Sequence, residues 1–171
     1  MHNVKVYAGI GSRNTPQDVL VDMKRLAEEL ALMRWTLRSG AAEGADTAFE
    51  EGSDLALGKK EIYLPWPKFN GHTTGIVCDD PRAFDMARQF HPAYSNLSRS
   101  VRKLMARNSH QIFGKNMDEP VQFVVCWTEG GLRKGGTGQA LRIAEAHGIV
   151  IYDLAIDSPE NVLKHAINWT S

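Results

Sequence analysis

Three times in this chain a strand-like run ends in a glycine-containing segment that leads into a helical pattern. The runs are VKVYAGIGSR, RWTLRSGAAEGAD, and VQFVVCWT with the following GGTGQALRIA. The first and third runs are apolar, as is typical of parallel strands buried on both faces. Strands that alternate with helices form a parallel sheet, because each helix carries the chain back across it. The sequence therefore predicts an α/β protein with an open, mostly parallel sheet flanked by helices.

The spacing of apolar residues predicts the first helix in detail. Thr15 is expected to cap it, and Pro16 suits its first turn. The side chains that recur at helical spacing form a stripe facing the core, and they are Val19, Leu20, Met23, Leu26, Ala27 and Leu30.

Further helices are expected over 44–58 (interrupted or ended near Gly52), 82–90, 96–114, 139–147 and 159–169, and further strands over 60–66 and 149–154. The stretch from Pro67 to Pro92 contains glycines, prolines and polar residues, so a long loop is expected before the helix over 82–90. Loops of that length in compact domains are usually functional or mobile. We therefore interpret the region from about 67 to 119 as a helical and loop insertion.

Composition excludes several classes of protein. A chain of 171 residues predicts a single domain, 1–171, and its zero net charge gives no global attraction to nucleic acid or membranes. Apolar runs are far shorter than the roughly 18 residues that a spanning helix needs. No leader pattern is evident at the start, and Cys78 and Cys126 suggest no disulfide framework. We expect a soluble cytoplasmic protein.

Small hydrogen-bonding residues follow three of the predicted strands, over 9–13, 39–46 and 128–138. Strand ends of a parallel sheet share one edge, where ligands collect, and glycine lets backbone N–H groups approach an anion there. Arg13 adds a guanidinium suited to phosphate. The pattern favours a nucleotide-like ligand, the alternative being glycines that serve tight turns alone.

Standard cofactor motifs are absent. Gly9 and Gly11 lack the third glycine of the dinucleotide fingerprint because residue 14 is Asn, and no G-x-x-x-x-G-K-[ST] occurs. No cofactor is expected. No metal is expected either, because the candidate ligands lack the close pairs of zinc sites; they are His72, Cys78, Asp79, His91 and His110. Cys126 lies in the most apolar strand and is expected in the core.

The segments YAGIGSR, SGAAEGAD and CWTEGG with GGTGQALRIA resemble the SLOG superfamily of Rossmann-like proteins. This superfamily includes the DNA-processing protein A (Smf) family, the Lonely-guy cytokinin-activating enzymes and nucleotide-sensing domains of antiviral systems. The resemblance covers most of the chain and is weakest over about 67–119. The nearest likeness is to small DprA-like proteins common in phages and prophages, which implies the host cytoplasm if the chain is phage-encoded.

The resemblance implies a site for a nucleotide, a nucleotide-derived signal or single-stranded DNA at the glycine-rich strand ends. It also implies a homo-oligomer. The positions carried over as ligand-binding are Gly11, Ser12, Arg13, Ser39, Gly40, Gly44, Asp46, Gly135, Gly136, Thr137 and Gly138. Trp127 or Trp66 is expected to cover a base, and Asp46 or Glu43 to meet ribose hydroxyls. We therefore expect a nucleotide-binding protein, with sequestration of a signal as one use.

An N-glycosidase acting on nucleoside 5′-monophosphates is the first alternative. The Lonely-guy motif P-G-G-x-G-T-x-x-E supplies a glutamate that stabilises an oxocarbenium-like state. Here Ala140 or Arg142 occupies that position, depending on the register. The remaining carboxylates that could act are Glu129, Asp46, Glu145, Glu50 and Glu51, each with the alternative of a solvated helix carboxylate. Binding is therefore favoured over hydrolysis.

DprA-like binding of single-stranded DNA is the second alternative. The predicted helix over 96–114 carries basic residues opposite its apolar stripe, and such a face can follow phosphates while aromatic rings stack on bases. The basic residues are Arg99, Arg102, Lys103 and Arg107, with Lys115 beyond, and the aromatic ones are Trp66, Phe69 and Trp127. An ordinary solvated face is the simpler interpretation. In a third interpretation Arg107, Asn108 and His110 fold over the glycine-rich edge and contact the ligand.

Overall fold

The computed structural model describes residues 4–169 and contains one six-stranded sheet in the order β4-β3-β2-β1-β5-β6. Every neighbouring pair of strands is parallel. The strands are β1 (Val6–Gly9), β2 (Thr36–Ser39), β3 (Lys60–Leu64), β4 (Ile76–Val77), β5 (Phe123–Cys126) and β6 (Val150–Asp153). The predicted α/β architecture with a Rossmann-like sheet is confirmed.

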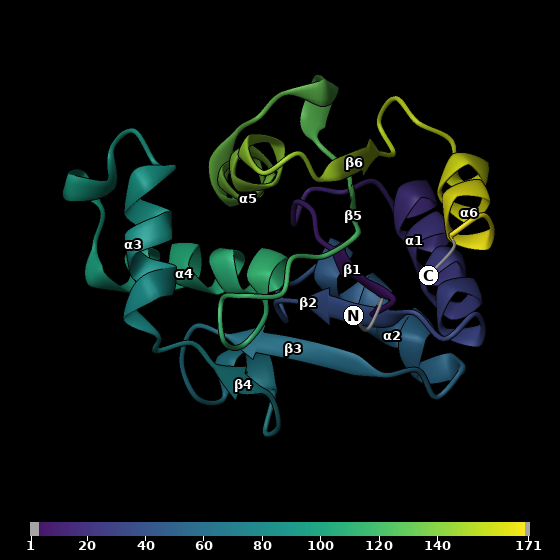
Figure 1. Cartoon of the computed structure of the whole chain (residues 1–171), viewed down its shortest axis with the longest axis horizontal. Coiled ribbons are helices and arrows are strands. Elements are labelled where there is room, and N and C mark those ends of the chain that lie inside the picture. The colour runs from purple at the N-terminus through teal and green to yellow at the C-terminus, as the bar shows by residue number, and fades with distance from the viewer. Residues whose placement is uncertain (1–3, 170–171) are drawn as a thin grey trace.

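Helices cover both faces of the sheet (Figure 1). They are α1 (Gln17–Leu32), α2 (Ala45–Leu55), α3 (Pro81–Gln89), α4 (Arg99–Phe113), α5 (Gly135–Ala146) and α6 (Pro159–Ile167). Side chains alternate between faces along a strand, so Tyr7 joins the core beneath α1, α2 and α6, whereas Val6 and Ala8 join the core beneath α4 and α5. No helix among residues 4–169 is long and apolar enough to cross a membrane.

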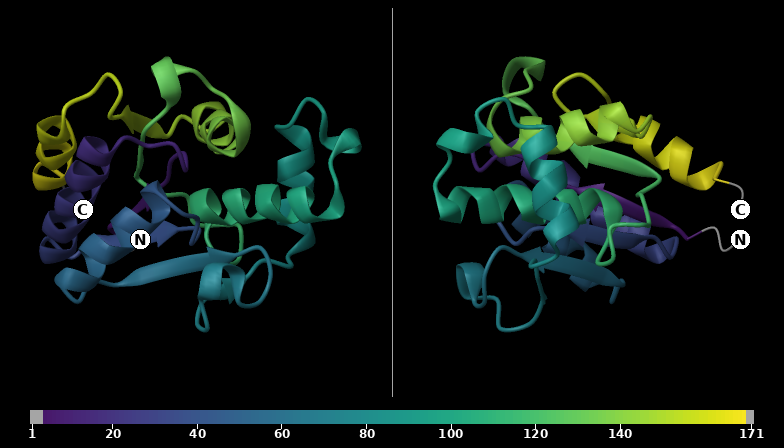
Figure 2. Two further views of the ribbon diagram at one scale, coloured as in Figure 1. Left: turned by 180° about the vertical axis from the view of Figure 1, so that it is seen from behind. Right: turned by 60° about the vertical axis from the view of Figure 1, so that its left-hand side comes forward.

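The region from about 67 to 119 contributes more to the core than an insertion would. The last turns of α4 bury Ile112 and Phe113 against the sheet. In contrast, α3 packs on α4, away from the sheet, as both views of Figure 2 show. The Ser109 hydroxyl donates to the Ala83 carbonyl, 3.0 Å away, and joins the two helices. The prediction missed β4, whose two residues are too few to show a pattern.

Three predicted helix boundaries are wrong. The N-cap of α1 is Pro16, and the Thr15 hydroxyl instead donates to the Ser12 carbonyl at 2.6 Å. The second helix continues through Gly52 to Leu55, and Gly52 faces α1, where a Cβ would lie 2.1 Å from the Lys24 carbonyl oxygen. The fifth helix begins at Gly135, four residues before the predicted start. In each case packing or loop geometry overrides local propensity.

Gly52 provides a test of the contact between α1 and α2. A Cβ at this position would lie 2.1 Å from the Lys24 carbonyl oxygen. We expect Gly52→Ala to lower the free energy of unfolding by about 1–3 kcal/mol through overpacking, although alanine is the better helix former by about 1 kcal/mol. Urea unfolding measures the difference. Glu51→Ala, at an exposed neighbouring position, is the control with an expected change below about 0.5 kcal/mol. A higher midpoint for Gly52→Ala would contradict the close packing.

Candidate functional site

The candidate site lies where β2, β1 and β5 end side by side, which we call the carboxyl edge. From β1 the chain first builds the sheet toward β4 and then returns to place β5 on the other side of β1. The strand order therefore reverses between β1 and β5. In open parallel sheets, ligands bind outside the carboxyl ends of strands at such a switch point.

The three glycine-containing segments meet around Gly11. A Cβ on Gly11 would lie 2.7 Å from the Ala45 Cβ at the start of α2, and 3.5 Å from the Trp127 nitrogen after β5. Gly44 has a φ of +83°, and a Cβ there would lie 3.0 Å from the Ser12 carbonyl oxygen. The segments after β1 and β2 thus pack against each other, and the chain that leaves β5 at Trp127 lies beside them.

The third segment forms the first turn of α5 rather than a loop. Because α5 begins at Gly135, the first-turn N–H groups have no partners within the helix and carry the positive end of its dipole. Gly135 is exposed and Gly136 half-buried. The Asn108 side-chain amide donates to the Gly136 carbonyl at 3.0 Å and to the Gln139 side chain at 3.1 Å. These bonds fix α4 against the start of α5.

Arg107 reaches the carboxyl edge from α4. It is 8% exposed, and its guanidinium donates to the Gly40 carbonyl at 2.9 Å and to Asn108 Oδ1 at 3.3 Å. Burial lowers the pKa of Arg107. A Cβ on Gly40 would lie 2.9 Å from the Arg107 side chain and 2.2 Å from that of Gln111, so this position requires glycine. The expected exposed basic face is therefore wrong for Arg107. Arg107 and Asn108 lie at the edge, as the third interpretation expected, whereas His110 packs on Tyr63 instead. Ligand contact by Arg107 and Asn108 stays a prediction.

Asp46 is buried beside Arg107. Its side chain is in the first turn of α2, is 4% exposed and accepts a hydrogen bond from the Ala42 amide at 3.2 Å. Desolvation raises the pKa of Asp46 to about 6, and the positive charge of Arg107 acts in the opposite direction. The interpretation of Asp46 as a solvated helix carboxylate is therefore wrong.

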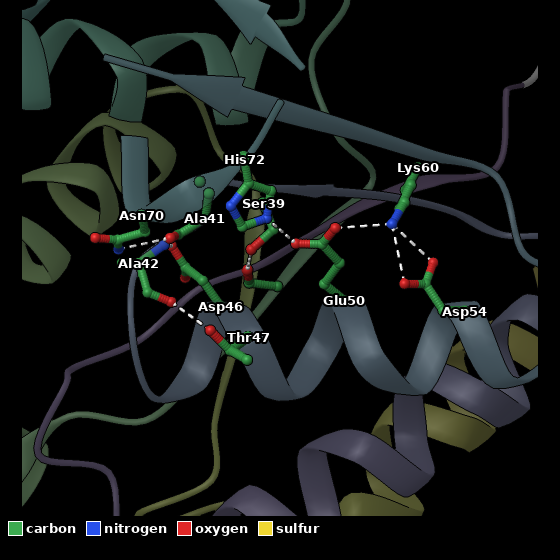
Figure 3. A network of polar contacts seen from close by, with 12 residues as sticks. Ser39, Ala41, Ala42, Asp46, Thr47, Glu50, Asp54, Lys60, Asn70 and His72 are labelled. Carbon is green, nitrogen blue, oxygen red and sulfur yellow. Dashed lines mark hydrogen bonds and ion pairs between the residues drawn. The ribbon is translucent and has the colours of Figure 1, made fainter. Parts of the chain in front are cut away.

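A loop over residues 66–72 folds over the end of β2, and the sequence did not indicate this. Figure 3 shows Asn70 directed toward the loop that precedes α2 and His72 directed toward Glu50 of α2. The Asn70 side-chain amide donates to the Ala41 carbonyl at 2.9 Å, and His72 Nε2 lies 2.7 Å from Glu50 Oε1. The Phe69 ring lies under the Arg107 guanidinium, 5.6 Å from its central carbon. This 66–72 loop therefore covers one side of Arg107.

The Glu50 carboxylate anchors the 66–72 loop from α2 (Figure 3). Besides His72, it contacts Lys60 Nζ at 2.7 Å, and Lys60 also lies 2.8 Å from an Asp54 oxygen. These ion pairs and hydrogen bonds lower the pKa of Glu50 despite its partial burial. Glu50 is therefore engaged in holding the loop.

The other candidate residues fall into inward and outward groups. Ser39 donates to the Gly9 carbonyl at 2.7 Å and is fully buried, whereas Arg13 is exposed at the edge. Trp127 is partly buried against the core beneath α1. Glu145 is exposed and paired with Arg133 at 2.8 Å. Ser12, Thr137 and Glu129 also lie at this edge, with Glu129 in an exposed turn.

The remaining basic residues of α4 lie near its start. Arg102 stacks over the Tyr94 ring at 4.7 Å and donates to the Ser95 carbonyl at 3.0 Å. Arg99 is exposed and Lys103 is partly exposed. The basic face that could follow phosphates is therefore smaller than the sequence indicated.

His110 and Cys126 are both buried, and His110 Nε2 has no hydrogen-bond partner among the described residues. His110 Nδ1 lies 3.0 Å from the Gly114 carbonyl oxygen, and its ring stacks on Tyr63. Cys126 is buried in the core, as predicted, and burial raises the pKa of its thiol. Within residues 4–169, no group of three His, Cys, Asp or Glu side chains is arranged to hold a metal ion.

No protein-family model matches this chain, and a search of curated proteins finds no match. Solved structures match it by shape. The Moco carrier protein of Chlamydomonas reinhardtii superposes with a TM-score of 0.58 and 15% sequence identity, covering 98% of this chain and 86% of that chain. This likeness shows a shared Rossmann-like fold.

Two further structures match less well. A second structure of the molybdenum cofactor carrier protein from Chlamydomonas reinhardtii gives a TM-score of 0.45 at 14% identity, covering 95% of this chain and 98% of that one. DNA processing protein A from Streptococcus pneumoniae gives 0.44 at 15% identity, and the match covers 94% of this chain and 61% of that one.

The raised pKa of Asp46 predicts how stability depends on pH. Between about pH 4 and 6 the folded state keeps a proton that the unfolded state has lost, so the free energy of unfolding falls as pH rises. Asp46→Asn keeps an acceptor for the Ala42 amide but carries no charge. Relative to wild type, the variant should gain about 2–3 kcal/mol between pH 4 and pH 7. Urea unfolding of both proteins at each pH measures this gain, and a constant difference would contradict the assignment.

Proposed function

We propose that this protein binds a nucleotide or nucleotide-derived molecule through its phosphates at the carboxyl edge, and holds it without cleaving it. The observation that carries the proposal is Gly136. Every other glycine of the chain either has a φ in the left-handed region or would bring a Cβ within 3.0 Å of a neighbour. At Gly136 the nearest atoms to a Cβ are side-chain atoms at 3.5 Å and 3.6 Å. Packing does not require glycine there, whereas a close backbone approach by an anion does.

The charges around Gly136 suit a phosphate. Unpaired N–H groups at the start of α5 supply donors, and Arg13 is exposed on the neighbouring β1–α1 loop. Arg107 adds a buried positive charge whose hydrogen bonds go to the neutral oxygens of Gly40 and Asn108. We propose that phosphate lies over the Gly11–Arg13 segment and the first turn of α5.

The remaining parts of a nucleotide have candidate partners on either side of that position. Trp127 lies on the β5 side of Gly11, and Trp66 lies in the 66–72 loop with its ring 5.2 Å from that of Phe69. Either indole offers a flat surface for a base. Glu43 is exposed and Asp46 is buried, so the geometry favours Glu43 for the ribose hydroxyls.

The positions of the carboxylates support holding over cleavage. Glu145 is paired with Arg133, and Asp46 accepts its hydrogen bond from the protein backbone. Where the Lonely-guy motif has glutamate, Ala140 is buried in the core and Arg142 donates to the Phe90 carbonyl at 3.2 Å. The Moco carrier that shares this fold is named for carrying a small molecule. We propose a comparable role here, with sequestration of a nucleotide signal as one use.

Gly136 variants test the binding site. In a panel of nucleotides measured by thermal shift, at least one should stabilise the wild type, by about 2.7 kcal/mol at a hundredfold excess over Kd. Gly136→Ala should fold with equal or greater stability, because alanine is the better helix former, yet lose most of the ligand-induced shift. Gly136→Asp should abolish the shift, since its charge stabilises the helix start but repels phosphate. Arg99→Ala, remote from the edge, should keep it. A panel with no shift in the wild type would refute the proposal.

Incubation with nucleoside 5′-monophosphates tests whether the bound molecule is cut. We expect no free base at high protein concentration, as measured by chromatography. Release of base would instead support the glycosidase alternative. Glu129→Gln, Glu145→Gln and Asp46→Asn would then identify the carboxylate that it needs.

A further inference from the structure

We infer that an anion binding at the carboxyl edge causes Asp46 to take up one proton, so that the site binds anions more tightly at low pH. This inference rests on the proposed function and adds a means of regulating the same site. It concerns two buried charged residues near the end of β2, Arg107 of α4 and Asp46 of α2. The question is how their charges respond when an anion binds.

The two charges are not directly bonded, but both meet the backbone of Gly40, where Arg107 donates to the carbonyl and Asp46 faces the amide. Both residues are more than nine-tenths buried. The Arg107 guanidinium donates to Gly40 and Asn108, whereas the Asp46 carboxylate accepts from the Ala42 amide. Their charges act on one another through space, and each changes the pKa of the other. Asp46 is therefore the distant counter-ion of Arg107 in the free protein.

A bound anion changes this balance. Electrostatic interactions are strong in a buried site because little water screens them. An anion near Arg107 offsets the positive charge that favours ionised Asp46, and it also repels that carboxylate directly. A neighbouring negative charge raises the pKa of a carboxyl group and so favours its protonated form. The carboxyl of Asp46, whose pKa burial already raises to about 6, is the group placed to do so.

The groups around Asp46 support this assignment. From β2 and its following loop it is faced by the Ser39 hydroxyl and by the backbone amides of Gly40 and Ala42, none of which titrates in this range. From α4 it is faced by Arg107. The Cys78 thiol also lies near Arg107, but burial raises its pKa to about 12, so it stays neutral. On α2 itself, Glu50 lies one turn beyond Asp46 and is paired with His72 of the 66–72 loop at 2.7 Å. Arg107 is the charge that lowers the pKa of Asp46.

The direction of the pH dependence follows. Below the pKa of the free protein, Asp46 is protonated with or without ligand, and affinity is constant. As pH rises from there to the higher pKa of the complex, binding requires proton uptake and weakens. A rise of about one pKa unit on binding corresponds to about tenfold weaker binding at pH 8 than at pH 5.

Sulfate is a suitable probe because its own charge does not change between pH 5 and pH 8. Carboxyl-carbon NMR of the full chain, with and without saturating sulfate, should show the pKa of Asp46 rising by about one unit. Calorimetry in buffers of different ionisation enthalpy should show net proton uptake between the two pKa values. Sulfate binding with an unchanged Asp46 pKa would overturn the inference and leave the proposed function intact. Failure of both sulfate and the nucleotide panel to bind would overturn both.

Variants separate charge from structure. Asp46→Asn keeps the hydrogen-bond acceptor and cannot change its charge, so its sulfate affinity should be the same at pH 5 and pH 8. Glu51→Gln, at an exposed position of the same helix, should keep the wild-type dependence. A retained pH dependence in Asp46→Asn would show that another group takes up the proton and would overturn the inference.

Discussion

The buried guanidinium of Arg107 is the constraint on which the carboxyl edge depends. A positive charge with so little access to water needs oxygen partners, and it finds them in Gly40 and Asn108. That arrangement requires glycine at position 40 and brings Phe69 of the 66–72 loop under the guanidinium. Arg107 thus contacts the end of β2 and the 66–72 loop from helix α4, and the Asn70–Ala41 and His72–Glu50 bonds add to the attachment of the loop.

The glycines at the three strand-to-helix junctions are needed for different physical reasons. Gly11 and Gly40 allow segments of the chain to approach one another, and Gly44 adopts a φ that other residues rarely take. Gly138 lies too close to the Arg133 backbone for a side chain. Gly136 has neither reason. Most glycines of these motifs are therefore explained by packing or by backbone conformation, and Gly136 is the one that neither explains.

Sequence patterns predicted the structure correctly where buried residues recur at regular spacing. They failed where a single tertiary contact determines the conformation or burial of a residue. The stripe on α1, including Met23, Leu26 and Leu30, is buried as its spacing predicts. In contrast, Gly52 lies inside α2 because α1 packs too closely for a side chain there, and this contact leaves no local signal in the sequence. Arg38 is similar: a charged residue within a strand is buried because Glu61 and Glu119, distant in sequence, pair with it.

The sequence by itself determined the α/β architecture, the parallel sheet and the three glycine-containing junctions at its carboxyl edge. Periodicity and strand-to-helix alternation are local properties, so a single chain displays them directly. Only the tertiary structure decided that Arg107 is buried at that edge rather than exposed on a basic helix face, and that Asp46 is buried beside it. The burial of a charge depends on neighbours brought together by folding, such as Gly40 and Phe69, which lie far from Arg107 in the sequence.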